Sequence, residues 1–377
     1  MTAEGKKVGV AIIGSGYWGI NYVRVFNELP NARVAAVCDA RQERLDEVQR
    51  RFPGLTVSPD LDEVLQMPDV EAAVICTGAT SHYAVASRCL EAGKHLLVEK
   101  PMATTVPDSL KLIGLAEKQD VILMVGHTFL YNPGVRKVKE YIAEDKMGRV
   151  YYLYSRRTNL GPIRYDVNSI WDLAPHDISI FNYLMESTPL WVSAVGSNIL
   201  NNTREDVGFV TLGYPDNVLG NIHVSWADPN KVRELVVVGS KQRVVFDDLN
   251  ALERVKIYQK GVTPSATKEA SSFGEFQFLI RDGDILSPRV EISEPLKNQC
   301  KHFLECIATG DRPLTDGWDG LRVVQVLQAI DRSVAQNGAP VFIDHESLRI
   351  SYEITASRNG HHSLPHQSHP VKVNGHA

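Results

Sequence analysis

Two charged side chains and a proline come directly after one short apolar run. Residues 95–98, His-Leu-Leu-Val, have the pattern of a buried strand, and Glu99, Lys100 and Pro101 follow it. A lysine at the end of a buried strand is costly to desolvate unless a partner or a substrate compensates for its charge. Pro101 fixes the backbone φ angle of the turn that follows. We therefore place catalytic chemistry at Lys100.

A nucleotide-binding fingerprint precedes these residues. The strand-like run 8–13 leads into Gly-Ser-Gly-Tyr-Trp-Gly at 14–19 and then into a helical pattern, which is the strand–turn–helix context that G-x-G-x-x-G requires. Gly14 allows the tight turn, Gly16 lets the backbone approach a pyrophosphate, and Gly19 permits close helix–strand packing. The helix N-terminus supplies free N–H groups and partial positive charge to the phosphates. We therefore predict a dinucleotide site here.

Asp39 ends the next strand-like run, 20 residues beyond Gly19, where a carboxylate would accept hydrogen bonds from the adenosine ribose. Its negative charge favours NAD over NADP, whereas Arg41 could stack on adenine or accommodate a phosphate. Thr77 and Gly78 end another predicted strand at the same edge of the sheet. Capping of the next helix is the alternative role for Thr77 and His82. The full set of predicted cofactor contacts is Gly14, Gly16, Tyr17, Trp18, Gly19, Asp39, Arg41, Thr77, Gly78, His82, Glu99 and Lys100.

An aspartate and a histidine follow in the segment Trp-Asp-Leu-Ala-Pro-His-Asp at 171–177. In a helix Asp172 and His176 share a face, so the carboxylate can orient the imidazole and stabilise its protonated form. Alcohol oxidation needs a base that takes the hydroxyl proton while the C–H leaves as hydride to nicotinamide. Lys100 would stabilise the developing alkoxide or shuttle the proton. The alternative is that Asp172 caps the helix and His176 packs in the core.

The elements that must position these residues form two groups. Up to residue 126, short apolar runs alternate with helical patterns, which predicts a parallel sheet covered on both faces. Beyond it, we expect a helix at 133–144, a strand at 150–156, a polar loop and a helix from about 174 to 186. Several strand patterns then follow one another without intervening helices, which predicts a mostly antiparallel sheet, and two helices at about 294–309 and 317–336 close the domain. The fold class is therefore α/β, with a Rossmann domain at 1–126, an α+β substrate-binding and oligomerisation domain at 127–350, and a mobile His-rich tail at 351–377. Metal binding by that tail is an alternative.

Composition narrows the function. Hydrophobic residues make up 44% and charged residues 23% of the 377-residue chain, as in soluble globular proteins. A formal net charge of −5 with no basic block argues against nucleic acid or an anionic membrane as the partner. No apolar run is long enough to span a membrane, and no hydrophobic leader is evident, so a cytoplasmic location is expected. The five scattered cysteines favour free thiols, and no metal site is expected.

The fingerprint at 14–19, Glu-Lys-Pro at 99–101 and the Asp172/His176 pair, in this order and spacing, resemble the Gfo/Idh/MocA oxidoreductases over about residues 7–350. The resemblance implies that Lys100, Asp172 and His176 act on a sugar or cyclitol hydroxyl. It also implies a homo-oligomer, a dimer or tetramer, built through the C-terminal sheet. The chain departs from the family motif at 168–171, where paired glycines are usual, and at Ala174, where a glycine is usual. These departures concern the shape of the pocket.

A polar loop expected at 156–164 suggests the substrate. Arginine pairs with two oxygens of a diphosphate or carboxylate at once, and a free polyol needs no such charge. With the string at 171–177, the loop resembles the nucleotide-sugar branch of the family, such as UDP-N-acetylglucosamine 3-dehydrogenases, which oxidise the C3 hydroxyl. Surface salt bridging is the alternative role for these arginines. The predicted substrate-binding residues are Lys100, Arg156, Arg157, Asn159, Arg164, Trp171, Asp172 and His176, with Lys231 and Arg233 as further charges.

Three matters stay open at this point. Trp171 stacks on the nicotinamide or sugar ring, or is a buried structural residue. A free-sugar or inositol dehydrogenase is an alternative to the nucleotide-sugar enzyme. A non-catalytic NAD-binding regulator is the third possibility, which the presence of Lys100, Asp172 and His176 disfavours because a sensor need not keep proton-transfer groups.

Overall fold

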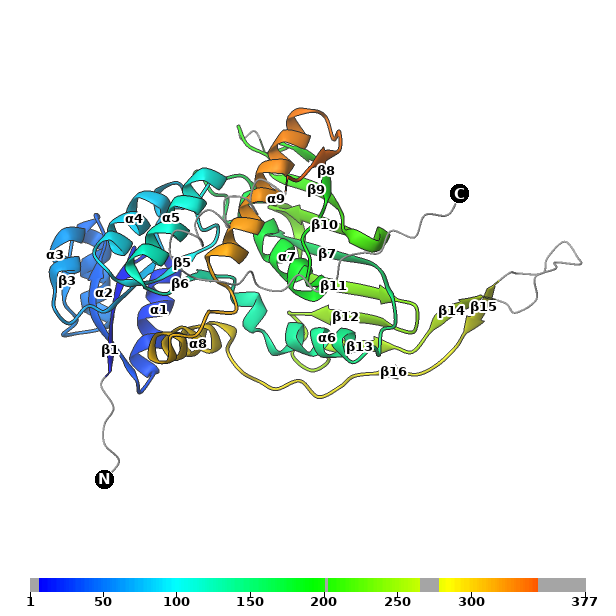
Figure 1. Ribbon diagram of the computed structural model, residues 1–377, viewed down its shortest axis with the longest axis horizontal. Helices are drawn as coiled ribbons and strands as arrows, with labels where there is room; N and C mark the ends of the chain where they lie inside the picture. The colour runs from blue at the N-terminus through cyan, green and yellow to red at the C-terminus, as the bar shows by residue number, and fades with distance from the viewer. Residues whose placement is uncertain (1–6, 201–202, 265–277, 345–377) are drawn as a thin grey trace, which may run out of the picture. The chain divides into compact units, whose positions relative to one another are not determined.

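The N-terminal strands form a six-stranded sheet in the order β3-β2-β1-β4-β5-β6, with every pair parallel (Figure 1). The computed structural model describes residues 7–200, 203–264 and 278–344. The strands are β1 (Val8–Ile13), β2 (Ala32–Cys38), β3 (Val57–Ser58), β4 (Ala72–Ile75), β5 (His95–Glu99) and β6 (Leu123–Gly126). The helices are α1 (Tyr17–Glu28), α2 (Gln42–Arg51), α3 (Leu61–Gln66), the 3-10 turn η1 (Ala79–Ser81), α4 (His82–Glu91) and α5 (Val106–Gln119).

The strand order reverses between β1 and β4, and ligands of such sheets bind outside the carboxyl ends of the strands at this point. Gly14 follows β1 with a φ of 91°, a conformation that favours glycine. Thr77 follows β4, and Lys100 follows β5. All three residues therefore lie at the same edge of the sheet.

The second sheet has nine strands in the order β16-β13-β12-β11-β7-β10-β9-β8-β17. Its pairs are antiparallel except β7 with β10, which are parallel. The strands are β7 (Val150–Leu160), β8 (Trp191–Ser197), β9 (Val207–Gly213), β10 (Leu219–Ser225), β11 (Ala227–Gly239), β12 (Arg243–Asp247), β13 (Val255–Tyr258), β16 (Ile285–Leu286) and β17 (Val341–Phe342). A separate hairpin pairs β14 (Gly261–Pro264) with β15 (Phe278–Arg281). The predicted fold class is confirmed.

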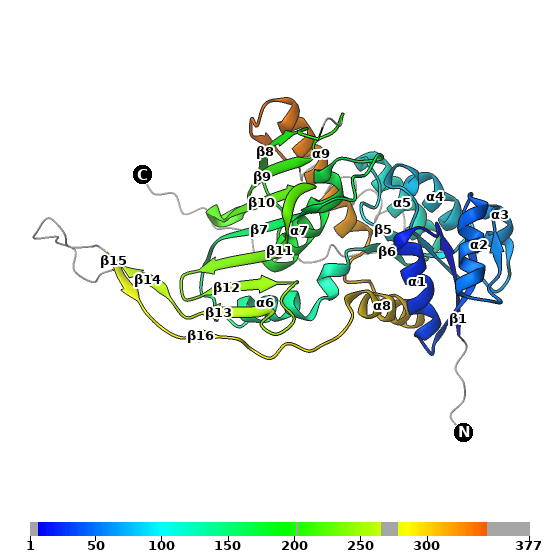
Figure 2. The same cartoon turned by 180° about the vertical axis from the view of Figure 1, so that it is seen from behind.

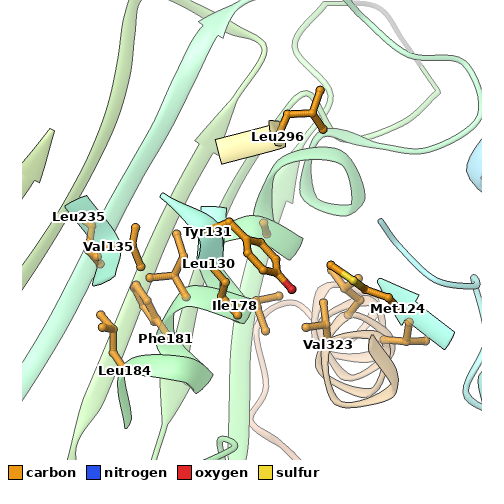
Figure 3. Packing of buried hydrophobic residues seen from close by; sticks show 14 of the residues in the cluster. Met124, Leu130, Tyr131, Val135, Ile178, Phe181, Leu184, Leu235, Leu296 and Val323 are labelled. Atoms are coloured by element: carbon orange, nitrogen blue, oxygen red, sulfur yellow. The ribbon is translucent and has the colours of Figure 1, made fainter. Parts of the chain in front are cut away.

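Helices pack against one face of this sheet (Figures 1 and 2). They are α6 (Pro133–Ala143), α7 (Ser169–Met185) and α9 (Gly317–Ala335), and the remaining helices are η2 (Thr128–Tyr131), η3 (Pro215–Asn217) and α8 (Pro295–Thr309). Figure 3 shows side chains from η2, α6, α7, α8 and α9 gathered in one apolar cluster, which also includes Met124 of β6 and Leu235 of β11. One core thus joins both sheets. Residues up to Ile343 form one compact unit, so the boundary expected at 126 stays a prediction.

Two predicted boundaries are wrong in ways that matter for the site. The strand expected to end at 156 continues as β7 to Leu160, because it pairs with both β10 and β11 along this stretch. The helix expected from about 174 starts at Ser169, because the Asn168 side chain caps it by accepting a hydrogen bond from Trp171 N at 2.8 Å. The tail predicted at 351–377 lies outside the described residues.

Within the described residues, no helix is long and apolar enough to cross a membrane. All five cysteines are free thiols, as predicted, and four of them are buried. Neither feature bears on the site.

The glycine fingerprint yields a test of packing. A Cβ atom at Gly19 would lie 1.9 Å from the Gly14 carbonyl oxygen, whereas a Cβ at Gly16 would meet nothing within 4 Å. Because the first clash involves backbone, we expect Gly19→Ala to lower the free energy of unfolding by about 2 kcal/mol or more, with little change for Gly16→Ala. Urea denaturation without cofactor measures the free energy of unfolding of both variants. Equal denaturation midpoints for the two variants would contradict the packing argument.

Candidate active site

Lys100 and Asp172 form a buried ion pair between the end of β5 and the first turn of α7. Lys100 Nζ lies 3.1 Å from Asp172 Oδ1 and donates to the Asp172 carbonyl oxygen at 2.6 Å. The two side chains are 6% and 17% exposed. Pro175 lies inside α7 and has no N–H to donate to the Trp171 carbonyl four residues before it. The structure thus brings together two residues that the sequence separates by 72 positions.

Two further groups hold the Asp172 carboxylate. Arg164 Nη1 donates to Oδ1 at 3.1 Å, and Trp226 Nε1 donates to Oδ2 at 3.2 Å. Burial alone would raise the pKa of Asp172, but the charges of Lys100 and Arg164 lower it below its ordinary value. Asp172 is therefore ionised and fixed in place.

His176 is a half-buried residue that lines a cavity, whereas Lys100 and Asp172 do not line it. Burial, reinforced by the positive charges of Lys100 and Arg157, lowers its pKa well below the ordinary value. Its Nδ1 is buried with no hydrogen-bond partner among the described residues, and its ring meets the Phe129 ring edge-on at 5.0 Å. The expected Asp172–His176 hydrogen bond is absent there, because the carboxylate is engaged by Lys100, Arg164 and Trp226. His176 is therefore a neutral base that can accept a proton.

His127, which we did not predict, is a second buried histidine in this region. It follows β6 at the carboxyl edge of the sheet, and neither ring nitrogen has a hydrogen-bond partner among the described residues. Burial and the charge of Lys100 lower its pKa to about 3. The rule that ligands lie beyond strand ends could have singled it out.

The cavity beside His176 has a volume of about 350 Å³ and is lined by both halves of the molecule. Six of the predicted residues line it: Tyr17, Trp18, Glu99, Arg157, Asn159 and His176. Arg233 also lines it, together with two polar residues that the sequence analysis missed, Asn132 and Asp248. Asn132 Nδ2 donates to Asp248 at 2.9 Å, and Arg233 Nη1 lies 3.4 Å from the same carboxylate. This polar cluster offers donors and acceptors of the kind that bind hydroxyl groups. Lys231 is exposed and does not line the cavity.

The three predicted arginines do not act together. Arg156 and Arg157 are neighbours in β7, and successive strand residues point to opposite faces, so Arg156 lies exposed on the far face of the sheet. Arg157 is buried and paired bidentately with Asp177 at 2.8 and 3.1 Å. Arg164 is paired with Asp166 and Asp172. The expectation that they form one phosphate-binding loop is wrong.

Trp171 is not placed to stack on a nicotinamide or sugar ring in the cavity. Its side chain is 7% exposed, and its Nε1 donates to both carboxylate oxygens of Asp331 at 2.9 Å. It does not line the cavity. The structure thus favours the buried structural role, in which Trp171 ties α7 to α9.

Glu99 connects the cavity to the core through a chain of hydrogen bonds. Its Oε1 accepts from Tyr22 Oη at 2.7 Å, and Tyr22 Oη accepts from Gln299 Nε2 at 2.7 Å. Gln299 Oε1 in turn accepts from Thr128 Oγ1 at 2.8 Å. Burial raises the pKa of Glu99 above its ordinary value, although the Tyr22 hydrogen bond and Lys100 oppose the shift. The network links α1, β5, α8 and η2.

The fingerprint has the shape that a dinucleotide needs. The space above Gly16 is open, and the exposed rings of Tyr17 and Trp18 follow it at the start of α1. Asp39 accepts from Ser15 N at 2.9 Å, which fixes the loop, and from Arg41 Nε at 3.0 Å. Burial opposes ionisation of Asp39, but its hydrogen bonds with Arg41 and Ser15 lower its pKa. Asp39 and Arg41 therefore act as a pair.

The residues after β4 divide into two kinds. Gly78 lies at the edge of the crevice, where a Cβ would be 3.5 Å from Asp166 Oδ2. Thr77 accepts a hydrogen bond from Ser81 Oγ at 2.8 Å, in the cap of the next turn. His82 is buried, with Nδ1 2.7 Å from the Pro101 carbonyl oxygen and Nε2 3.1 Å from that of Thr77. We expected His82 to contact cofactor, but it supports the two loops instead.

Comparison with known proteins agrees with this architecture. The family model described as "Oxidoreductase family, NAD-binding Rossmann fold" matches residues 8–127, and the "GFO/IDH/MocA C-terminal domain" matches residues 135–245. The chain belongs to the Gfo/Idh/MocA oxidoreductases. The predicted enzyme class and NAD as cofactor are thereby confirmed.

Relatives of stated function align over most of the chain. It is 24% identical to myo-inositol 2-dehydrogenase of Thermotoga maritima, over 87% of this chain and 96% of the relative. It is 25% identical to UDP-N-acetylglucosamine 3-dehydrogenase of Acidithiobacillus ferrooxidans, over 83% and 93%. The solved structure of GenD2 from gentamicin A biosynthesis, in complex with NAD, superposes with a TM-score of 0.77 at 23% identity, over 91% of this chain and 98% of GenD2. The last likeness shows the fold.

The Asp39–Arg41 pair yields a test of cofactor choice. We expect Asp39→Ala to lower the preference for NAD over NADP at least about tenfold, because the variant loses the carboxylate that would accept from the ribose and repel a 2′-phosphate. Dissociation constants for both cofactors, from quenching of tryptophan fluorescence, measure this preference. As controls, Asp39→Asn removes the negative charge but keeps an oxygen that can accept from Ser15 N, and Arg41→Ala removes the neighbouring positive charge. An unchanged preference in Asp39→Ala would rule out this role.

Proposed function

We propose that this enzyme oxidises a secondary hydroxyl of a sugar to a ketone with NAD. The observation that carries the proposal is His176 on the cavity wall, which burial and the positive charge of Lys100 keep neutral, while Lys100 itself is paired with Asp172. A hydroxyl placed between Lys100 and His176 would meet a cation and a base together. The reverse reaction, ketone reduction, uses the same groups.

The residues divide the work. His176 Nε2 would accept the hydroxyl proton, because burial keeps the imidazole neutral and its Nδ1 faces the interior. The Lys100 ammonium would stabilise the developing alkoxide, and Asp172 would hold Lys100 in position. Gly14, Gly16, Asp39 and Gly78 would hold the dinucleotide, with the Tyr17 and Trp18 rings beside its nicotinamide end. NAD supplies the acceptor for the hydride that leaves the same carbon.

The cavity contacts support a ring that bears several hydroxyls. Asp248, Arg233 and Asn132 lie on its wall and together offer carboxylate, guanidinium and amide groups. Such a set accepts and donates hydrogen bonds to neighbouring hydroxyls. We infer that these residues orient the sugar ring while Lys100 and His176 act on one carbon.

For the substrate itself we propose a nucleotide sugar oxidised at C3. Its support is the alignment with UDP-N-acetylglucosamine 3-dehydrogenase. A free sugar or inositol is the second candidate, because Arg157 and Arg164 are already paired with aspartates and neither offers a free guanidinium to a diphosphate. A regulator without turnover would need none of the proton-transfer geometry.

A substrate panel distinguishes these possibilities. We expect reduction of NAD, followed by absorbance, with UDP-N-acetylglucosamine or another nucleotide sugar, and Lys100→Met is expected to lower kcat at least about a hundredfold with NAD affinity nearly unchanged. Lys94→Met, a lysine whose Nζ donates to the Val70 carbonyl at the opposite edge of the sheet, is the matched control. Turnover of free polyols alone would favour the second candidate, and Lys100→Met with activity within a few-fold of wild type would remove Lys100 from the mechanism.

We also propose that the uncovered face of the nine-stranded sheet builds a homo-oligomer. Tyr152, Phe209 and Leu219 on this face are each nearly half exposed, and the Phe209 ring stacks on His223 at 4.4 Å. Leu219 lies opposite Tyr152 in the register of β7 and β10. Together they make an apolar patch of the kind that pairs between subunits.

Light scattering coupled to size exclusion tests this assembly. We expect a dimer or tetramer for the wild-type chain and a smaller species for Phe209→Asp/Leu219→Asp, because the two carboxylates would be buried unpaired at the interface. Leu249→Asp, an exposed leucine in the turn after β12, is the control. A wild-type monomer, or a mass that the double variant leaves unchanged, would contradict the proposal.

A further inference from the structure

A second and larger groove lies next to the cavity that His176 lines. Its volume is about 1290 Å³, and α6, the turn after β12, the segment 287–293 and α8 form its walls. Residues adjacent in the chain line the two spaces. Asn132 lines the cavity and Pro133 the groove; Glu294 lines the cavity and Ser293 the groove. The groove is therefore adjacent to the site and distinct from it.

The groove is lined by more cations than anions. Five lysines and arginines and three glutamates line it. The side chains of Arg254, Arg289 and Lys301 make no ion pair or hydrogen bond to any described residue, and the buried Nε of Arg254 has no partner there. Arginines are usually paired when their nitrogens are buried, because an unpaired donor costs free energy. Arg254 Nε is therefore a buried donor without a partner, and the exposed Arg289 and Lys301 add two unpaired cations to the same groove.

Two further groups extend this donor set. Arg136 packs against the Tyr131 ring at 5.5 Å and uses Nε for the Leu130 carbonyl oxygen at 3.2 Å, which leaves its terminal nitrogens for another partner. His302 Nε2 accepts from Leu314 N at 2.9 Å, so the ring proton lies on Nδ1. The nearest acid to His302 is Glu305, 3.9 Å away. The groove thus presents guanidinium forks, an ammonium and an imidazole N–H.

The arginines that the sequence predicted as phosphate ligands are engaged in ion pairs within the protein, unlike the unpaired cations of the groove. Arg157 and Arg164 each bind an aspartate within the protein, whereas Arg254 and Arg289 have no such anion. A planar guanidinium binds two phosphate oxygens at once, and several around one hollow suit a diphosphate better than a monovalent anion. We propose that the groove binds a ligand through two or more phosphate groups.

Two sources could supply this chemistry. One is the diphosphate of a nucleotide sugar whose ring lies in the cavity, in which case the inference rests on the proposed substrate. The other is a free phosphorylated ligand that binds independently of turnover. Both require the same cations.

Calorimetric titration of the full chain with pyrophosphate and with UDP tests the groove, with saturating NAD present to fill the cofactor phosphate site. We expect saturable binding that weakens at least about tenfold in Arg254→Gln/Arg289→Gln and weakens further at high salt. Arg50→Gln/Lys118→Gln removes two exposed charges from the other sheet's helices and is expected to bind like wild type. Lys301→Gln changes an exposed side chain and serves if the double variant fails to fold.

The outcomes separate the sources and the proposals. Competition between UDP and the sugar substrate, with KM raised and kcat kept in the groove variants, would assign the substrate's diphosphate. UDP binding without competition would assign a free phosphorylated ligand. No saturable binding, or equal binding in groove and control variants, would overturn the inference. The inference would also be overturned, with the proposed function left standing, if the groove variants turned over a nucleotide sugar with unaltered KM and UDP neither bound nor inhibited the enzyme.

Discussion

The burial of Lys100 is the constraint on which the rest of the site depends. An ammonium that is 6% exposed would cost several kcal/mol of solvation if it had no partner. Its counter-ion, Asp172, comes from α7, so the end of β5 and the start of that helix must meet. Asn168 fixes where α7 begins, and Trp171 ties the same turn to Asp331 of α9. The joining of the two sheets is thus built around one ion pair.

A second set of contacts holds the same junction from the other side. Glu99, next to Lys100, is linked by hydrogen bonds to Tyr22 of α1 and through it to Gln299 of α8. His82 holds the Pro101 and Thr77 carbonyl groups together behind the crevice. The loops that would meet cofactor are therefore fixed by buried polar contacts, and Lys100 lies directly at a strand end rather than within a long loop.

Much of the fold could be predicted from the sequence because it depends on local patterns. Apolar runs alternating with helical patterns predict the parallel sheet, and the fingerprint at 14–19 predicts its turn. The arginines show where this approach failed. The polar stretch after residue 156 was interpreted as a loop, yet it pairs with two strands, and the period of two then sends Arg156 and Arg157 to opposite faces. Whether a polar stretch becomes a strand depends on distant partners, which no local pattern reveals.

The site residues were predictable by type but not by partnership. Asp172 and His176 share a helix, which suggested that the carboxylate serves the imidazole, but the stronger demand of the buried Lys100 engages the carboxylate instead. This division has a chemical consequence. A carboxylate bound to His176 would raise the pKa of the imidazole and favour its charged form, whereas His176 next to cations is kept neutral. In the proposed reaction a hydroxyl proton would move to His176, the alkoxide left behind would lie beside Lys100, and the total charge of the site would not change. Such a transfer would require no ion to enter or leave the cavity.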